Sequence, residues 1–272
     1  SFIIVMIGIL DDHRNISVSL RLLFQMLVAI IIVTVGDTSI ESLGYLFGSD
    51  EIVLNKWAYF VSVIAIISGM NAINMTDGIH GLAGGTSLVT FLAILYLSID
   101  SISQEYVLIV FLFCSVLPVF LIHNLCLGLP ERNRIFMGDA GSMLIGLVIA
   151  WLLINLSQGE ERAFAPVTAL WLFAAPLIDM ISAILRRLAS GKSPFMPDLY
   201  HFHHLLIRLG IGEKFTLLVL ILFSVLMAVI GILGGLYEVA EWVMFVGFLL
   251  VVGAHILLCS ITLRKSKALK IH

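Results

Sequence analysis

Charged residues are scarce in this sequence. Asp, Glu, Lys and Arg make up only 12% of its 272 residues, whereas a soluble domain usually has about 25%. The net charge is −3 and no basic stretch is suited to nucleic acid, which excludes a nucleic-acid partner. Hydrophobic residues account for 60% of the chain, and the mean hydropathy is +1.11. This composition indicates an integral membrane protein.

Cysteine is scarce as well. The three cysteines, Cys114, Cys126 and Cys259, all lie in apolar segments. Their spacing fits neither a CxxC metal site nor a disulfide framework. We therefore expect them to be packing residues.

Long apolar runs, by contrast, are abundant. A helix needs about 20 apolar residues to cross a bilayer. Eight such runs are found at residues 17–35, 57–73, 83–99, 105–127, 140–156, 164–185, 215–236 and 242–263. Residues 1–10 look like the end of a further span, so we expect that additional N-terminal sequence precedes them. The predicted fold is all-α, a polytopic transmembrane helix bundle of eight full spans plus the end of another, with residues 1–272 in a single domain.

Positive charge is concentrated on one side of the predicted bundle. If the spans alternate in direction, thirteen of the 15 Lys and Arg residues lie on one side, and only Lys56 and Arg162 lie on the other. Cytosolic loops carry an excess of Lys and Arg, so the first side is predicted to face the cytosol. Its loops are 11–16, 74–82, 128–139, 186–214 and 264–272.

The polar residues that could carry chemistry gather in these predicted cytosolic loops. Asp11 and Asp12 directly follow ten almost wholly apolar residues. An ionised carboxylate in hydrocarbon costs about 2.5–3.5 kcal/mol even on the most lenient scale, so these acids need a partner or a function. The polar stretches of the other loops are candidates to supply it.

The stretch "NAINMTDGIHGLAGG" at 71–85 places Asn71, Asn74, Asp77 and His80 at every third position. Its glycines predict a helix that ends near Asp77, followed by a turn whose backbone N–H groups can approach a ligand closely. Polar packing between helices is the alternative. Four polar side chains exceed what packing requires, which favours a ligand site.

The stretch "FMGDAGS" places Asp139 at the start of a predicted span. A plain N-cap aspartate is one interpretation. The other takes Asp11, Asp12 and Asp77 into account, because all four acids fall on the same predicted side. Mg²⁺ binds one or two carboxylates together with substrate phosphates, so this set favours a magnesium site.

Residues 198–210, "DLYHFHHLLIRLG", predict a short amphipathic helix. His201, His204 and Arg208 lie along one of its faces, and His203 lies off that row. Histidine clusters also bind zinc, but no cysteine is near and the arginine would repel a cation. The combination of arginine and histidines suits an anionic diphosphate better.

Three further polar residues lie within predicted spans. Asp179 is about two turns from the basic end of its span, and it is either a structural partner of Arg186, on the same helical face, or a functional group. His255 is isolated in the last span and is expected to be a packing residue. Asn124 lies near the predicted cytosolic end of its span, close to the polar loops.

Taken together, "DDHRN", "NAINMTDGIHGL", "FMGDAGS" and "HFHHL" resemble the successive motifs of the polyprenyl-phosphate N-acetylhexosamine-1-phosphate transferases in order, spacing and topology. The resemblance extends over essentially the whole chain. It implies transfer of GlcNAc-1-phosphate, or another N-acetylhexosamine-1-phosphate, from a UDP-sugar to undecaprenyl phosphate with release of UMP. In this family the reaction initiates lipid-linked cell-surface polysaccharides of the O-antigen or enterobacterial common antigen type.

The resemblance also implies roles for individual residues. Asp139 would hold Mg²⁺, with Mn²⁺ as the alternative, and Asp11 or Asp12 would deprotonate or orient the lipid phosphate. The positions that match the nucleotide and metal surroundings are Asn74, Asp77, Asn124 and Phe136, and His80 is expected to bind substrate beside them. The loop that would contact the donor sugar and phosphate carries His201, His203, His204 and Arg208. The family usually has Asp where this chain has Asn15 and His80.

The same resemblance implies partners and a location. The expected substrates are UDP-GlcNAc, or a related UDP-N-acetylhexosamine, and undecaprenyl phosphate. Membrane lipid and a second copy of the chain in a homodimer are further expected partners. The expected location is the bacterial cytoplasmic (inner) membrane, with several spans and the active site on the cytosolic face.

Two other classes of membrane protein share some of these features. A secondary transporter also has polar residues between broken spans, but it gathers them near the middle of the membrane. An intramembrane prenyltransferase also uses acid pairs with Mg²⁺, but it does not need the histidine loop. The polar residues of this chain gather at one predicted face and include that loop.

Overall fold

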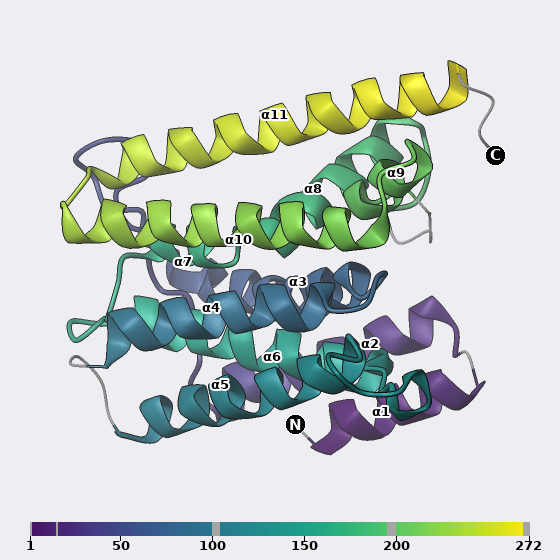
Figure 1. The fold of residues 1–272 in the computed structure, drawn as a ribbon. Coiled ribbons are helices and arrows are strands. Elements are labelled where there is room, and N and C mark those ends of the chain that lie inside the picture. Colours follow the sequence, from purple (N-terminus) through teal and green to yellow (C-terminus); the bar gives the residue numbers. More distant parts are fainter. Residues whose placement is uncertain (1, 15, 100–103, 195–199, 269–272) are drawn as a thin grey trace.

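The structure is a computed structural model, and it describes residues 2–14, 16–99, 104–194 and 200–268. Within these ranges the fold is helical, and the predicted all-α class is confirmed (Figure 1). The only β pairing in the described ranges is an isolated bridge between Ser42 and Val53. The α-helices are α1 (Phe2–Arg14), α2 (Val18–Val35), α3 (Ala58–Thr76), α4 (Leu82–Ser98), α5 (Gln104–Asn124), α6 (Gly138–Ser157), α7 (Pro166–Leu172), α8 (Ala174–Ala189), α9 (Phe202–Arg208), α10 (Glu213–Leu236) and α11 (Glu241–Ala268). A 3₁₀ turn at Asn55–Trp57 precedes α3, and another at Glu131–Asn133 lies between α5 and α6.

The helices that could cross a membrane are fewer than the eight predicted spans. In the part of the chain that the structure describes, six helical segments are long and apolar enough: α2, α3 with its preceding turn, α5, α6, α10 and α11. The predicted span 83–99 corresponds to α4, which has 17 residues. The predicted span 164–185 is broken into α7 and α8, which are bent by 86°. The chain is thus a multi-pass membrane protein, but the count of eight full spans is not confirmed.

The break between α7 and α8 has a local cause. Pro176 has no backbone N–H to donate to the carbonyl of Leu172, four residues earlier, which removes one hydrogen bond of a continuous helix and favours a break there. The hydroxyl of Thr90 on α4 donates to that carbonyl instead, at 2.9 Å. A polar group that would otherwise be unpaired in an apolar interior is thereby satisfied.

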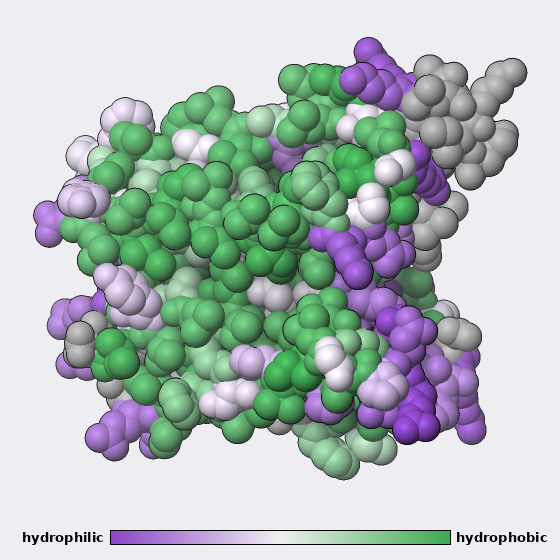
Figure 2. All heavy atoms as spheres, in the orientation of Figure 1, coloured by the Kyte–Doolittle hydropathy of each residue, from purple (hydrophilic) through white to green (hydrophobic). Residues whose placement is uncertain are grey.

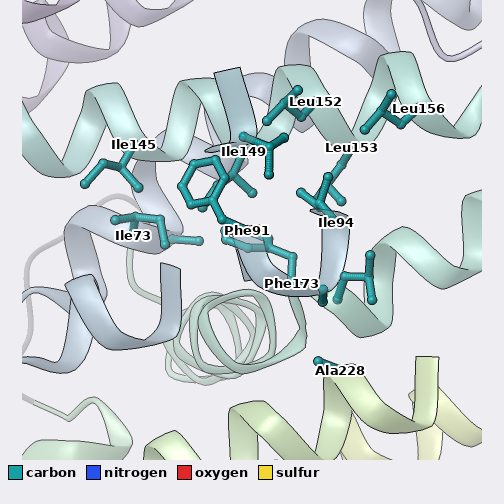
Figure 3. Close-up of a cluster of buried hydrophobic side chains, with 14 of the residues drawn as sticks. Ile73, Phe91, Ile94, Ile145, Ile149, Leu152, Leu153, Leu156, Phe173 and Ala228 are labelled. Atoms are coloured by element: carbon teal, nitrogen blue, oxygen red, sulfur yellow. The ribbon is translucent and has the colours of Figure 1, made fainter. Parts of the chain in front are cut away.

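The centre of the bundle is α6, which packs on α1, α3 and α4. Its buried side chains Ile149, Leu152 and Leu156 meet Phe91 and Ile94 of α4 (Figure 3). At the crossing of α3 and α6, Gly69 and Gly146 bring the two backbones together, because a Cβ on Gly146 would collide with the Gly69 carbonyl. Small residues permit such close crossings in membrane helices. The close packing fixes the end of α6 that carries Asp139.

The surface matches that of a protein embedded in a bilayer. On the face seen in Figure 2, a wide hydrophobic band covers the middle of the molecule, with hydrophilic residues at its two ends. On α5, for example, the side chains of Leu108, Phe111 and Leu112 are 57–67% exposed. Hydrophilic residues are most prominent at the end where α9 lies in Figure 1. This end is called the α9 end below.

Candidate active site

The polar motifs that are far apart in the sequence meet at the α9 end. The carboxyl ends of α1, α3 and α5 lie there with the amino ends of α2, α4 and α6. Hydrogen bonds join these ends: Asp12 bonds to Asp139, Asn74 to Asp139, and Asn124 to Gly81. A candidate active site therefore forms where helix ends converge.

Asp12 and Asp139 meet at the amino end of α6. A carboxylate oxygen of Asp12 accepts a hydrogen bond from the backbone N–H of Asp139 at 2.8 Å. The first N–H groups of a helix have no partner within it, and the helix dipole favours a negative charge there. Gly138 has a positive φ of 65°, and a Cβ on it would lie 2.7 Å from Asp12 Oδ2. Glycine at this position lets the two acids approach.

The carboxylate of Asp139 is held in a defined orientation. Asn74 of α3 donates from Nδ2 to Asp139 Oδ1 at 2.5 Å and contacts Ser142 Oγ at 3.1 Å. The other carboxylate oxygen lies 3.9 Å from the guanidinium of Arg21. The Asp139 side chain is 33% exposed. It is therefore fixed by protein contacts while remaining accessible to a ligand.

Asp11 plays a different part from its neighbour Asp12. Asp11 is only 4% exposed and accepts a hydrogen bond from Arg21 Nη1 at 3.2 Å, whereas Asp12 is exposed. Arg21 thus lies between Asp11 and Asp139. Its Nε is buried and has no hydrogen-bond acceptor among the described residues. One donor of this guanidinium is therefore unpaired within the described ranges.

Asp77 follows α3 directly and completes the group of acids. Burial in its surroundings, followed by the negative charges of Asp139 and Asp12, raises the pKa of Asp77 to about 6. The acids therefore repel one another, and a bound cation would relieve this repulsion. Within the described ranges, no three His, Cys, Asp or Glu side chains converge closely enough to hold a metal by themselves. Mg²⁺ fits such a set, because it completes its shell with water and substrate phosphates.

A second cluster flanks the acids. Arg134 Nη1 donates to His80 Nε2 at 3.2 Å and Nη2 of the same residue lies 3.6 Å from Glu131. The ring of Phe136 is 72% exposed, with its centroid 5.4 Å from that of His80. An exposed aromatic ring beside a guanidinium offers a flat surface to a planar, anionic ligand.

Asn124 holds this second cluster in place. Its Oδ1 accepts from the backbone N–H of Gly81 at 2.6 Å, and its Nδ2 donates to the carbonyl of Ile135 at 2.7 Å. The side chain is buried and both ends of its amide bond to backbone. Asn124 therefore ties the loop that carries Phe136 to the start of α4.

The histidines precede and enter the short helix α9. His203 is only 2% exposed, and its ring abuts Gly78 so closely that a Cβ there would collide with it. Burial, followed by the neighbouring His204, lowers the pKa of His203 to about 4, so its ring is neutral at pH 7. The ring centroids of His203 and His204 are 4.1 Å apart. Arg208, at the end of α9, lies over the ring of Tyr200, 5.2 Å from its centroid.

His201 lies immediately before α9. Its Nδ1 is 2.8 Å from Asp179 Oδ2, and the N–H of Phe202 donates to Asp179 Oδ1 at 3.0 Å. Asp179 of α8 thereby anchors the start of α9. Asp179 thus has His201 and Phe202 as partners in addition to any interaction with Arg186, the partner considered from the sequence.

A cleft of about 310 Å³ opens beside the acids. Its polar lining comes from Arg21, Asn71, Asn74, Asp77, Arg187 and His201. Its apolar lining comes from Val18 and Leu22 of α2, Ile67 and Met75 of α3, and Met180 and Ile184 of α8. Ser68 of α3 lines both this cleft and an apolar cavity of about 260 Å³ near the α7–α8 break. Polar groups at one end and apolar walls behind them suit an amphipathic ligand.

The structure brings together most of the residues that the sequence singled out. Asp139 contacts Asp12 and Asn74, and Arg21 links it to Asp11. Asn74 lines the cleft together with Asp77 and His201. His80, Asn124 and Phe136 form the flanking cluster. Asn15 and residues 195–199 lie outside the described ranges. The expected roles of all these residues remain predictions.

Sequence reasoning missed Arg21 and Arg187 as site residues. Both lie inside or at the end of otherwise apolar helical segments. Charged residues in such positions usually face a partner or a functional cavity. This signal in the sequence could have identified both residues.

Comparisons with known proteins agree with the motifs. The model of the glycosyl transferase family 4 matches residues 1–157. An undecaprenyl-phosphate alpha-N-acetylglucosaminyl 1-phosphate transferase from Escherichia coli (strain K12) is 42% identical over 250 residues, which cover 91% of this chain and 68% of that protein. The enzyme with the same name from Haemophilus influenzae is 43% identical over 252 residues, covering 91% and 70%. That from Yersinia pestis is 42% identical over 249 residues, covering 91% and 68%.

Proposed function

The chain belongs to the glycosyl transferase family 4, and we propose that it transfers GlcNAc-1-phosphate from UDP-GlcNAc to undecaprenyl phosphate with release of UMP. This reaction would initiate a lipid-linked cell-surface polysaccharide. The observation that carries the proposal is the group of acids beside a cleft with apolar walls, which Asp77 and Asn74 line. Such a site suits a reaction between a soluble nucleotide-sugar and a phosphate embedded in lipid.

The chemistry requires two anions to meet. An oxygen of the lipid phosphate forms a bond to the β-phosphorus of the UDP-sugar. The bond between that phosphorus and the oxygen that bridges it to the α-phosphorus breaks, and UMP leaves with the electron pair. Positioning and neutralisation of negative charge dominate catalysis of phosphoryl transfer.

We propose that Asp139 holds Mg²⁺, or Mn²⁺ in its place, with Asp12 and Asp77 nearby. The ion would neutralise charge on the diphosphate and make its β-phosphorus more electrophilic. Burial, followed by the negative charges of Asp139 and Asp12, raises the pKa of Asp77, and the repulsion among these acids supports a bound cation. Mg²⁺ binds one or two carboxylates together with substrate phosphates, so it would not need further protein ligands.

Arg21 and Arg187 would bind the phosphate of the lipid substrate. Both line the cleft, and Arg21 retains a buried Nε without an acceptor among the described residues. Asp12, which is exposed, would orient or deprotonate that phosphate, while the buried Asp11 would hold Arg21 in position. The isoprenoid chain would follow the apolar walls of α2, α3 and α8.

The UDP-sugar would approach from the flanking cluster. Phe136 offers its exposed ring to the uracil, and Arg134 beside His80 offers positive charge to the phosphates. His201, His203, His204 and Arg208 would border the sugar and diphosphate. We propose that the α9 end faces the cytosol of a bacterial inner membrane, which is supported by the excess of Lys and Arg on that side.

The two other functions considered from the sequence fit less well. A transporter site would lie near the middle of the membrane, whereas these polar residues lie at helix ends. A prenyltransferase would leave the histidines of α9 and the loop that carries Phe136 without a role. Neither class is the one named for the relatives reported above.

Radiolabelled UDP-GlcNAc tests the proposal. The purified chain is placed in vesicles that contain undecaprenyl phosphate and Mg²⁺, and UDP-[¹⁴C]GlcNAc is added. We expect label in the organic phase that requires the lipid phosphate. If label enters the lipid only from another UDP-N-acetylhexosamine, the proposed donor sugar is wrong. If no UDP-sugar gives labelled lipid, the proposed reaction is refuted.

A further inference from the structure

Asp179 is a carboxylate on α8 beside the candidate site, and the sequence left open whether it is structural or functional. We propose that Asp179 is a positioning residue that holds the His201 ring in one orientation and one protonation pattern toward the substrate phosphates. This inference rests on the proposed function. It concerns how the site is organised, and Asp179 itself need not touch substrate.

Both carboxylate oxygens of Asp179 are engaged at the start of α9. Oδ2 lies 2.8 Å from His201 Nδ1, and Oδ1 accepts from the N–H of Phe202 at 3.0 Å. The backbone bond fixes where the chain enters α9, and the side-chain bond fixes the rotation of the imidazole ring. Two bonds to consecutive residues leave the ring little freedom.

The contact also determines which ring nitrogen remains for a ligand. A carboxylate only accepts hydrogen bonds, so Nδ1 of His201 carries the proton and Nε2 is the other nitrogen. His201 lines the cleft together with Arg21, Asn74, Asp77 and Arg187. A protonated imidazole can donate from Nε2 to a phosphate, and the carboxylate on Nδ1 stabilises its positive charge.

A second histidine, His255, lies close to Asp179. His255 Nε2 of α11 lies 3.9 Å from Asp179 Oδ1, while its Nδ1 lies 2.8 Å from Ser182 Oγ. The His255 ring also packs against the ring of Phe202 in a T-shaped contact, with centroids 4.9 Å apart. Asp179 is thus surrounded on its far side by a buried network that fixes its own orientation.

A purely structural explanation is that Asp179 only anchors α9. The substitution Asp179→Asn separates the two explanations, because asparagine keeps the size of the side chain but has a single acceptor oxygen. If that oxygen stays with Phe202 N–H, the amide NH₂ faces His201 Nδ1. That nitrogen then has to accept, and the proton moves to Nε2. The helix stays anchored while the imidazole changes its tautomer.

Nitrogen NMR of ¹⁵N-histidine-labelled protein in nanodiscs reads the tautomer directly. The His201 signals are assigned by comparison with His201→Asn. We expect the wild-type ring to be protonated on Nδ1. In Asp179→Asn we expect the proton to move to Nε2. Ser182→Ala is the matched control, because it removes a hydrogen bond from the same buried network and should change only His255. A wild-type His201 protonated solely on Nε2 would overturn the inference even if Asp179→Asn does not fold.

The kinetics of GlcNAc-1-phosphate transfer provide a second test of this inference. We expect Asp179→Asn to lower kcat at least tenfold with wild-type thermal stability, and to have less than a twofold effect in the His201→Asn background. Multiplicative effects of the two substitutions, or a wild-type kcat in Asp179→Asn, would overturn the inference. If the wild-type chain makes no GlcNAc-lipid, the proposed function fails, whereas the tautomer measurement still decides the role of Asp179.

Discussion

At the scale of single residues, four acids share one small region of the molecule with Arg21 among them. A packed helical bundle gains nothing from such repulsion, because each carboxylate removed from water costs free energy unless it is paired. The arrangement is explained if a cation and substrate phosphates complete the site. Asp139 is central, since it contacts Asn74, Arg21 and Asp12.

We predict that Asp139→Asn abolishes transfer and leaves the protein folded. The substitution keeps the shape of the side chain but removes a charge from the proposed metal site. A lost metal contact worth several kcal/mol should lower the rate at least about a thousandfold. Asp50→Asn, at an exposed position in the loop 36–54, should retain full activity. Near-normal transfer by Asp139→Asn at saturating Mg²⁺ would contradict the assignment.

His203 makes stability depend on pH. Its pKa is about 4 in the folded protein and close to 6.5 when unfolded, so between these values only the unfolded chain binds the proton. Lowering the pH from 7 to 5 should therefore reduce the free energy of unfolding, by about 2 kcal/mol from this residue. Melting temperatures at both pH values should fall less in His203→Asn than in the wild type. An equal fall in both would contradict burial of a neutral ring.

The sequence was informative about these residues to different degrees. Asp11, Asp12, Asp77 and Asp139 could be found because acids beside apolar runs are costly. The partner of Asp179 could not be found, because His201 is 22 residues away and the contact depends on the fold. The different burial of Asp11 and Asp12 likewise depends on which face of α1 packs on the bundle.

At the scale of elements, the turn between α3 and α4 was predictable and the break between α7 and α8 was not. The glycines after Asp77 end α3 as expected, and Gly81 has a φ of 82° at the start of α4. The apolar residues continue through Phe173, so hydropathy alone predicts a single span at 164–185. Pro176 favours a break, but Pro118 lies within the unbroken α5, so a proline alone does not decide it. The bond from Thr90 of α4 to the freed carbonyl of Leu172 depends on the fold.

The importance of the contact between α9 and the α3–α4 turn can be tested by the substitution Gly78→Ala, which adds one methyl group. A Cβ on Gly78 would collide with the buried ring of His203, so Gly78→Ala should displace α9. Overpacking usually costs about 1–3 kcal/mol, and we expect a lower melting temperature and at least tenfold slower transfer. Gly253→Ala on α11, where nothing lies within 4 Å of the new Cβ, should change neither. Unchanged transfer in Gly78→Ala would show that this contact is dispensable.

At the scale of the whole molecule, the face seen in Figure 2 has a hydrophobic band between two hydrophilic ends, and the α9 end is the more hydrophilic of the two. Cysteines introduced at Ser49 and Ser193, both exposed, should react with an impermeant thiol reagent from opposite sides of intact cells. We expect Ser49→Cys to react from outside, because positive charge favours the side of Ser193. The three native cysteines are first replaced. Reaction of both positions from one side would contradict the proposed orientation.

The central claim is that phosphorus moves with the sugar from a nucleotide to a lipid. UDP-GlcNAc labelled with ³²P at the β-phosphorus or at the α-phosphorus tests this directly in vesicles that contain undecaprenyl phosphate. Our account predicts that β label enters the organic phase and that α label is recovered as UMP in water. If β label stays in water as UDP while the sugar enters the lipid, or if neither label is transferred, the account is contradicted.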